Sequence, residues 1–364
     1  MTRPATVETL EQRALRCGAD LVLEGGGVKG IGLAGAVITL SEAGYVFPRV
    51  GGTSAGAIVA ALVAAYQTKN VPLSQLETDM RGLQYSKFRE QSFLDRHLGP
   101  AGLADALVRH QGLYSTEYLS EWLHSKLDPI GVRTFADLKI TDDPGISLPP
   151  LQRYRLVVHT SDLTRQSLVR LPWDLPHYLL ADDGENATDE QRIAAIDAYP
   201  VVDAVRASMS IPFFFQPFRQ DTPEGSCTWV DGGLLQNFPI TVFDRNDDQP
   251  ARWPTFGIKL SAQPQVNVPD KAIAGDISEL LAIAHTALGE WDRYPLDNTV
   301  ASRTIWVDTM HVPATDFGID TPTQDQLFAN GRDAATAFLT AWNTAHPPAT
   351  NQPLPAPPPM PQHA

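Results

Sequence analysis

The segment Gly52-Thr53-Ser54-Ala55-Gly56 decides how the chain around it is expected to fold. The apolar run 45–50 before it is typical of a strand, and the alanine-rich run 57–65 after it is typical of a helix. A Gly-x-Ser-x-Gly sequence in this context is the pattern of a nucleophile elbow, a sharp turn that presents the serine hydroxyl above a helix N-terminus. Backbone N–H groups and the helix dipole favour negative charge there. The alternative is a helix that merely begins with small buried residues.

A second strand–loop–helix unit lies just upstream. Leu21–Glu24 predicts a short buried strand, and Gly25-Gly26-Gly27-Val28-Lys29-Gly30 predicts a tight loop after it. An apolar helix is expected over Ile31–Ala43, with Gly44 at its C-terminal cap. Two such units in succession indicate a parallel sheet.

The length and composition fit one large α/β domain. The chain has 364 residues, of which 43% are apolar and 19% charged, so it can bury a sizeable core. We therefore predict a three-layer α/β/α fold over residues 20–345, with a mainly parallel central sheet and helices on both faces. Residues 1–19 are expected to form a polar lead-in, and the proline-rich segment 346–364 a disordered tail.

The rest of the chain supplies further expected elements. Residues 70–140 are expected to be mostly helical, and the acidic stretch 181–192 an exposed loop. Strands are expected at 153–160, 167–171, 227–230, 255–260 and 303–307, the first two paired as a hairpin, and helices at 201–210, 276–294 and 324–342.

The glycine loop allows two interpretations. Its Gly-x-Gly-x-x-Gly spacing after a strand resembles a dinucleotide fingerprint, but that fingerprint requires an acidic residue at the end of the second strand. Here the second strand ends in Gly51-Gly52-Thr53-Ser54, so the dinucleotide interpretation is disfavoured. Consecutive glycine N–H groups at a helix N-terminus also form an anion hole, which a serine hydrolase needs for its oxyanion. Lys29 adds positive charge nearby or is a solvated surface lysine.

A serine nucleophile needs a base, and the sequence offers Asp231 more clearly than any histidine. None of the nine histidines stands in an obvious catalytic context, although His159 and His311 lie close to expected strand ends. Asp231 ends an expected strand and precedes Gly232 and Gly233, so its carboxylate is expected at the C-terminal edge of the sheet. The alternative is an aspartate that only stabilises a turn.

Charge and composition exclude several classes of function. The net charge of −14 argues against nucleic acid as a partner and against a polybasic membrane tether. The only cysteines, Cys17 and Cys227, allow no disulfide framework, which fits a reducing compartment. We see no signal peptide and no transmembrane run, so we expect a cytoplasmic protein with at most weak, peripheral membrane contact. No cluster has metal-ligand spacing, so neither a metal nor another cofactor is expected.

Three motifs together resemble the patatin-like phospholipase family. These are Gly25–Gly30, Gly52–Gly56 and Asp231–Gly233, in the family's order and spacing, and the resemblance extends over residues 20–310. Segments 134–138, 207–212 and 237–239 also match. Gly233 in place of alanine and Lys29 in place of arginine are similar to the bacterial branch of the family.

The resemblance implies a function and a set of site residues. It implies a Ser–Asp dyad with Ser54 as nucleophile and Asp231 as general base, an oxyanion hole around Gly26 and Gly27, and hydrolysis of lipid acyl esters without a metal. The phenylalanine-rich run 213–218 suits an acyl-chain pocket or a membrane-facing lip, or plain core packing. Acyl transfer to another alcohol, and a lipid- or nucleotide-binding module without catalysis, are the alternative functions.

Overall fold

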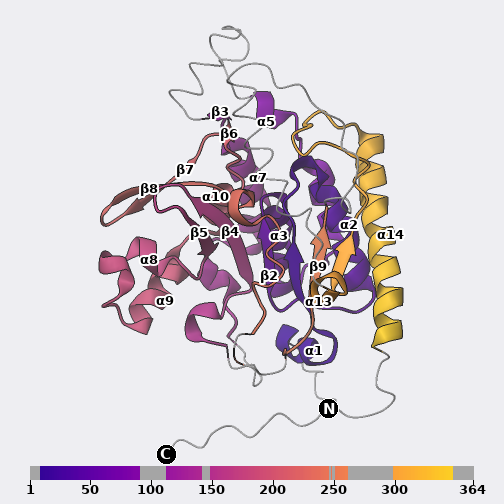
Figure 1. Ribbon diagram of the computed structural model, residues 1–364, viewed down its shortest axis with the longest axis horizontal. Helices are drawn as coiled ribbons and strands as arrows, with labels where there is room; N and C mark the ends of the chain where they lie inside the picture. The colour runs from indigo at the N-terminus through magenta and orange to yellow at the C-terminus, as the bar shows by residue number, and fades with distance from the viewer. Residues whose placement is uncertain are drawn as a thin grey trace, which may run out of the picture.

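An eight-stranded sheet forms the centre of the molecule (Figure 1). The computed structural model describes residues 9–90, 112–141, 148–245, 247, 251–260 and 298–346. Five strands are parallel and hydrogen-bonded in the order β10 (Thr304–Trp306), β9 (Thr255–Lys259), β1 (Asp20–Leu23), β2 (Val50–Thr53) and β4 (Leu156–Asp162). Three strands are antiparallel: β5 (Ser167–Leu171) and β8 (Gly225–Asp231) both pair with β4, and β7 (Phe218–Thr222) pairs with β8. The predicted α/β fold with a mainly parallel sheet is confirmed.

Long helices cover one face of the sheet. They are α2 (Gly30–Glu42), α3 (Ala55–Thr68), α10 (Val201–Ser208) and α14 (Thr321–Ala345). Leu21, Leu23 and Val158 point to this face and belong to the main hydrophobic core. α2 is buried along almost its whole length because α14 packs along it, as Figure 1 shows at the edge of the molecule. The unbroken apolar sequence of α2 follows from contact on all sides.

Shorter elements cover the other face. Val22 and Val157 point there and pack with Phe238, Ile240 and Phe243 in a second core cluster. The short helices α11 (Gly233–Gln236) and α13 (Asn298–Ala301) lie on this side, where α11 contacts β4 and β5 and α13 contributes Val300. The remaining described elements are α1 (Leu10–Cys17), η1 (Gly27–Lys29), α4 (Gln75–Gly82), α5 (Lys87–Glu90), β3 (Gly112–Tyr114), α7 (Glu117–Leu127), η2 (Asp128–Ile130), η3 (Phe135–Leu138), η4 (Pro150–Gln152), α8 (Pro176–Leu179), η5 (Ala181–Gly184), α9 (Asp189–Ala198) and β6 (Phe213–Phe215).

Most expected elements form where the sequence indicated, but three segments differ. The strand before the elbow is β2 at 50–53 rather than 45–50, because Pro48 interrupts the apolar run and the pairing starts after it. The stretch expected as mostly helical, 70–140, also contains the strand β3, which pairs with β6. The helix expected at 276–294 and the tail beyond His346 lie outside the described residues.

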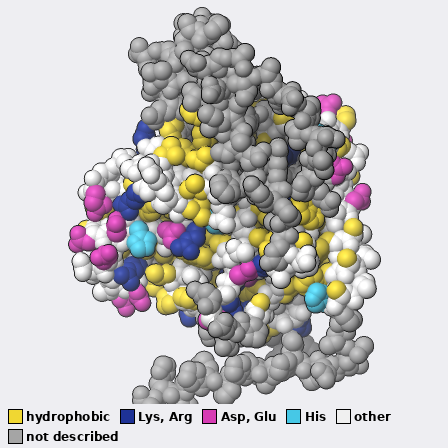
Figure 2. Space-filling view, viewed as in Figure 1, with side chains coloured by type: hydrophobic (Ala, Val, Ile, Leu, Met, Phe, Trp, Pro, Cys, Tyr) yellow, Lys and Arg dark blue, Asp and Glu magenta, His cyan; other side chains and the backbone are white. Residues whose placement is uncertain are grey.

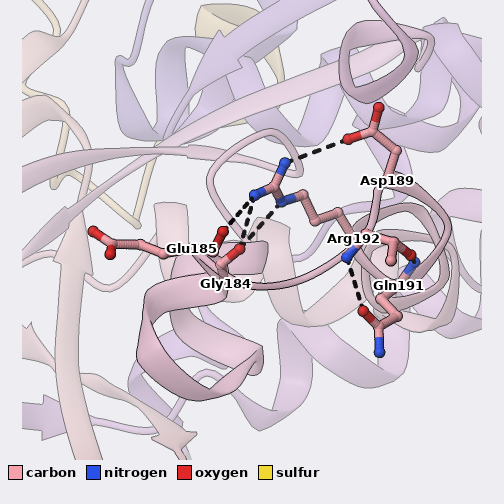
Figure 3. Close-up of polar contacts among 6 residues, drawn as sticks. Gly184, Glu185, Asp189, Gln191 and Arg192 are labelled. Carbon is pink, nitrogen blue, oxygen red and sulfur yellow. Dashed lines mark hydrogen bonds and ion pairs between the residues drawn. The ribbon is translucent and has the colours of Figure 1, made fainter.

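The acidic stretch 181–192 is more ordered than the predicted loop. It forms η5 and the first turn of α9, whose N-terminus has a capping box between Thr188 and Gln191. Arg192 donates to the carbonyls of Gly184 at 2.9 Å and Glu185 at 3.3 Å, and so fastens the turn to the helix (Figure 3). The acidic composition is therefore that of a solvated surface, and Figure 2 shows mixed charges over α8 and α9.

Candidate active site

Ser54 occupies the turn between β2 and α3, as the elbow pattern predicts. Its φ of 54° and ψ of −124° lie in a region that residues with a Cβ rarely adopt. Its N–H donates to Ser208 Oγ at 3.0 Å, and its hydroxyl contacts Met209 Sδ at 3.5 Å. Ser54 is buried, with 5% of its surface exposed.

Asp231 meets the end of β2 through an arrangement of strands that the sequence did not predict. Thr53 lies opposite His159 of β4, and Asp231 lies opposite the next residue, Thr160. Because β5 pairs with this part of β4 along its other edge, β2 and β8 must share one edge. The two strands therefore run toward each other and meet end to end. Asp231 thus ends an antiparallel strand and lies beside the C-terminal end of the parallel strand β2.

The carboxyl group of Asp231 is buried and only partly hydrogen-bonded. The residue is 1% exposed, and its Oδ1 accepts from the Gly233 N–H at 2.7 Å. Its Oδ2 has no hydrogen-bond partner among the described residues. Burial raises the pKa of Asp231 to about 7, while the nearby Ser54 hydroxyl and the Gly233 N–H lower it. The group can therefore take or release a proton near neutral pH.

The glycine loop lies directly beside Ser54. A Cβ placed on Gly25 would lie 3.1 Å from Ser54 Cβ. Gly27 has a φ of +56°, and a side chain there would overlap the Ala314 carbonyl, so only glycine suits the position. The loop is fastened from outside by Asn237, whose carbonyl accepts from the Gly25 N–H and whose side chain donates to the Gly25 carbonyl, both at 3.2 Å.

Most N–H groups of the glycine loop are already hydrogen-bonded within the protein and so are not available to an anion. The N–H groups of Gly25, Val28, Lys29 and Gly30 donate to the carbonyls of Asn237, Ala314, Gly26 and Gly27 respectively. Those of Gly26 and Gly27 donate to no acceptor in the described part of the chain. Of the six residues named from the sequence for the oxyanion hole, these two therefore keep donors that are free for a ligand.

The two histidines considered as bases lie elsewhere. His159 is 1% exposed, and burial lowers its pKa to about 4, with Arg170 lowering it further. It lines a cavity of about 740 Å³ that neither Ser54 nor Asp231 lines. His311 is exposed. Within the described ranges no hydrogen bond joins either histidine to Ser54 or Asp231.

An apolar cavity of about 380 Å³ lies beside β6 and β8, and neither Ser54 nor Asp231 lines it. Val230, which precedes Asp231, lines it, together with Leu163, Pro212, Phe213 and Phe215. Figure 2 shows hydrophobic side chains gathered on the surface beside β6 and β7. Phe215 belongs to the main core and also lines this cavity, Phe213 lines the cavity, and Phe214 and Phe218 pack against the core.

The described residues offer neither a cluster suited to a metal ion nor a helix suited to crossing a membrane. No group of three or more His, Cys, Asp or Glu side chains is placed to hold a metal ion there. No helix within the described ranges is both long and apolar enough to cross a membrane.

Comparison with known proteins decides the family. The model of the family described as patatin-like phospholipase matches residues 21–244, which contain both strand ends and the glycine loop. The chain belongs to the patatin-like phospholipase family. Hydrolysis of lipids is thus the general activity that its membership supports. The uncharacterised protein YqhO of Bacillus subtilis (strain 168) is 33% identical over 327 residues, which cover 89% of this chain and 98% of YqhO.

The solved structures that resemble this chain share less of its sequence. VipD of Legionella pneumophila is 19% identical, with a TM-score of 0.48, and the match covers 90% of this chain and 67% of VipD. In the ExoU–SpcU heterodimer from the type III secretion system of Pseudomonas aeruginosa, the matched chain is 18% identical, with a TM-score of 0.41. That match covers 89% of this chain and 52% of the other.

Sequence reasoning missed how the segment after α10 enters the site. Ser208 and Met209 contact Ser54, and the Ser210 carbonyl accepts from the Asp231 N–H at 2.9 Å. The segment matched the family pattern, but nothing in its composition indicated which of its atoms face the serine.

Proposed function

We propose that this chain hydrolyses carboxylic esters of lipids, of the phospholipase A or lysophospholipase type, with Ser54 as nucleophile and Asp231 as general base. The observation that carries the proposal is the meeting of β2 and β8, which sets a buried carboxyl with an unpartnered oxygen beside the elbow serine. Such a pair is what attack by a serine hydroxyl on a carbonyl requires.

The proposed reaction uses Ser54, Asp231 and two N–H groups of the glycine loop. Ser54 Oγ attacks the ester carbonyl while its proton passes to Asp231 Oδ2. The oxyanion of the tetrahedral intermediate accepts from the free N–H groups of Gly26 and Gly27, in a position that the helix dipole of α2 also favours. Asp231 then gives the proton to the leaving alcohol. Water, deprotonated by the same carboxylate, attacks the acyl-enzyme; the bond between the acyl group and Ser54 Oγ breaks, Asp231 returns the proton to Ser54 Oγ, and the fatty acid is released.

The environment of Asp231 makes it a useful base. A carboxylate with an ordinary pKa is too weak to take a proton from a serine at an appreciable rate. The buried site raises the pKa of Asp231 to about 7, so the carboxylate is more basic yet still ionised in half or more of the molecules at neutral pH.

The activity is expected to depend on pH through this group. The base must be ionised, and it is ionised above its pKa of about 7. We therefore expect kcat/KM on an uncharged short-chain ester to be half-maximal near pH 7 and to fall about tenfold for each unit below it. A profile that stays flat from about pH 5 to pH 8 would rule out Asp231 as the base.

The apolar cavity beside Val230 is proposed to receive the acyl chain. Phe213 forms part of its wall, so Phe213→Ala should weaken the binding of long acyl chains and spare short ones. We expect kcat/KM to fall about 10- to 100-fold for a long-chain ester, by loss of apolar contact, and to change little for a butyrate ester. Leu235→Ala is the matched control, because Leu235 is 46% exposed and does not line the cavity. Equal losses on both esters would exclude this assignment.

The substrate class is best tested with defined lipids. Phospholipids, lysophospholipids and acylglycerols are incubated with the wild-type protein, and the products are measured by mass spectrometry. Release of free fatty acid supports hydrolysis, while transfer of the acyl group to an added alcohol indicates acyl transfer by the same residues.

A further inference from the structure

The segment 208–210, at the end of α10, contacts both proposed catalytic residues. Ser208 Oγ accepts from the Ser54 N–H at 3.0 Å, and Met209 Sδ touches the Ser54 hydroxyl at 3.5 Å. The Ser210 carbonyl accepts from the Asp231 N–H at 2.9 Å. The three residues are between 0% and 4% exposed.

We propose that Ser208 is a positioning residue, whose hydroxyl holds the backbone of Ser54 so that the serine side chain is aimed at Asp231. This inference rests on the proposed function of the pair. Ser54 is held at a φ of 54°, which costs conformational energy, and that geometry persists only where its surroundings impose it. Ser208 contributes to this constraint because its hydroxyl oxygen is the acceptor for the Ser54 N–H.

Removing the hydroxyl leaves a buried donor without a partner. The Ser54 N–H would then lose its hydrogen bond in a buried position, which favours a relaxed turn. A relaxed turn moves the Ser54 side chain away from its direction of attack, and small misplacements of a reacting group cost large factors in rate. The loss should fall on kcat, because Ser208 acts through the backbone of Ser54.

Ser210 supplies a matched control within the same segment. Its hydroxyl donates to the Arg206 carbonyl at 2.9 Å, and its own carbonyl, not its side chain, contacts Asp231. Ser210→Ala therefore removes an equally buried hydroxyl from the same turn without touching Ser54. A purely structural role of the segment would give both variants the same loss.

The experiment compares Ser208→Ala and Ser210→Ala by kinetics, by the rate of labelling with a fluorophosphonate, and by thermal unfolding. We expect Ser208→Ala to lower kcat and the labelling rate of Ser54 about 10- to 100-fold, with KM within about twofold of the wild type. Ser210→Ala should stay within about threefold in every kinetic constant. Equal losses in the two variants, or full activity of Ser208→Ala, would overturn the proposal.

Two further measurements deal with a variant that does not fold and with the identity of the labelled residue. If Ser208→Ala does not fold, Ser208→Cys keeps the size of the side chain and a weak acceptor, and its kcat should lie below that of the wild type and of Ser210→Ala. Mass spectrometry of the labelled wild-type protein identifies the modified residue. If that residue is not Ser54, the proposed function fails. If it is Ser54 and the Ser208 variants label at the wild-type rate, only the positioning role fails.

Discussion

Replacement of Ser54 by alanine is expected to abolish both ester hydrolysis and labelling by a fluorophosphonate probe. The probe reacts quickly only with an activated hydroxyl, and Ser54 is the residue at the strained turn beside Asp231. By analogy with other serine hydrolases, kcat should fall by at least about 10⁴-fold. The remaining rate is measured on a soluble short-chain ester, so that changes in membrane contact do not enter.

The control for this experiment is a measurement that Ser54→Ala still folds. Alanine keeps the Cβ and the N–H that donates to Ser208, so the turn should persist and the melting temperature should change by no more than a few degrees. Labelling that survives in folded Ser54→Ala would place the nucleophile elsewhere.

Replacement of Asp231 by asparagine is expected to lower kcat by about 10³- to 10⁴-fold. The loss of an aspartate costs about 10⁴ in a serine protease triad, where the carboxylate only orients a histidine. Here the carboxylate would accept the serine proton itself. The amide keeps an oxygen for the Gly233 N–H, so the local structure is retained while the basicity is lost. The measurement is kcat/KM on the same short-chain ester.

Two histidine variants are the matched controls. His159→Gln and His311→Gln should each keep most of the activity, because neither histidine bonds to Ser54 or Asp231 in the described structure. If either falls as far as Asp231→Asn, the site contains a triad and the proposed mechanism is wrong.

Asp231→Asn should also change stability in a way that depends on pH. Burial raises the pKa of Asp231 from 3.8 to about 7, so the folded state holds the proton more tightly than the unfolded chain between those values. The free energy of unfolding of the wild type therefore falls as pH rises through this range. The variant lacks this term. Its melting temperature relative to the wild type should be higher near pH 8 than near pH 5.

The local parts of the site were predictable from sequence, because the residues that determine them are close together along the chain. A strand, small residues at a turn and an apolar helix fix the position of Ser54 within one stretch of chain, as β2 and α3 show. The glycine loop was predictable for the same reason. The sequence could not show which N–H groups of the loop stay free, because this depends on the carbonyls of Asn237 and Ala314, which are distant in sequence.

The pairing of strands far apart in sequence could not be deduced. Asp231 was placed at the end of a strand, but an antiparallel β8 and its meeting with β2 depend on the register against β4. Likewise, the position of Ser208 beneath Ser54 depends on how α10 packs on the sheet. For the stretch 181–192, composition indicated exposure correctly, but it could not reveal that Arg192 ties the turn to α9.

The pairing of β1 with both β2 and β9 has a consequence for the order in which the protein is made. A ribosome completes β1, β2 and the turn at Ser54 early, whereas β8 and β9 emerge much later. Until β9 has been made, one edge of β1 has no partner strand. The unpaired edge of the nascent chain can then pair with a strand of another chain. On the proposed mechanism, such a chain also carries a nucleophile without its base. On this mechanism the chain can cleave lipids only late in synthesis, once β8 has emerged; β9, which pairs with the open edge of β1, follows it.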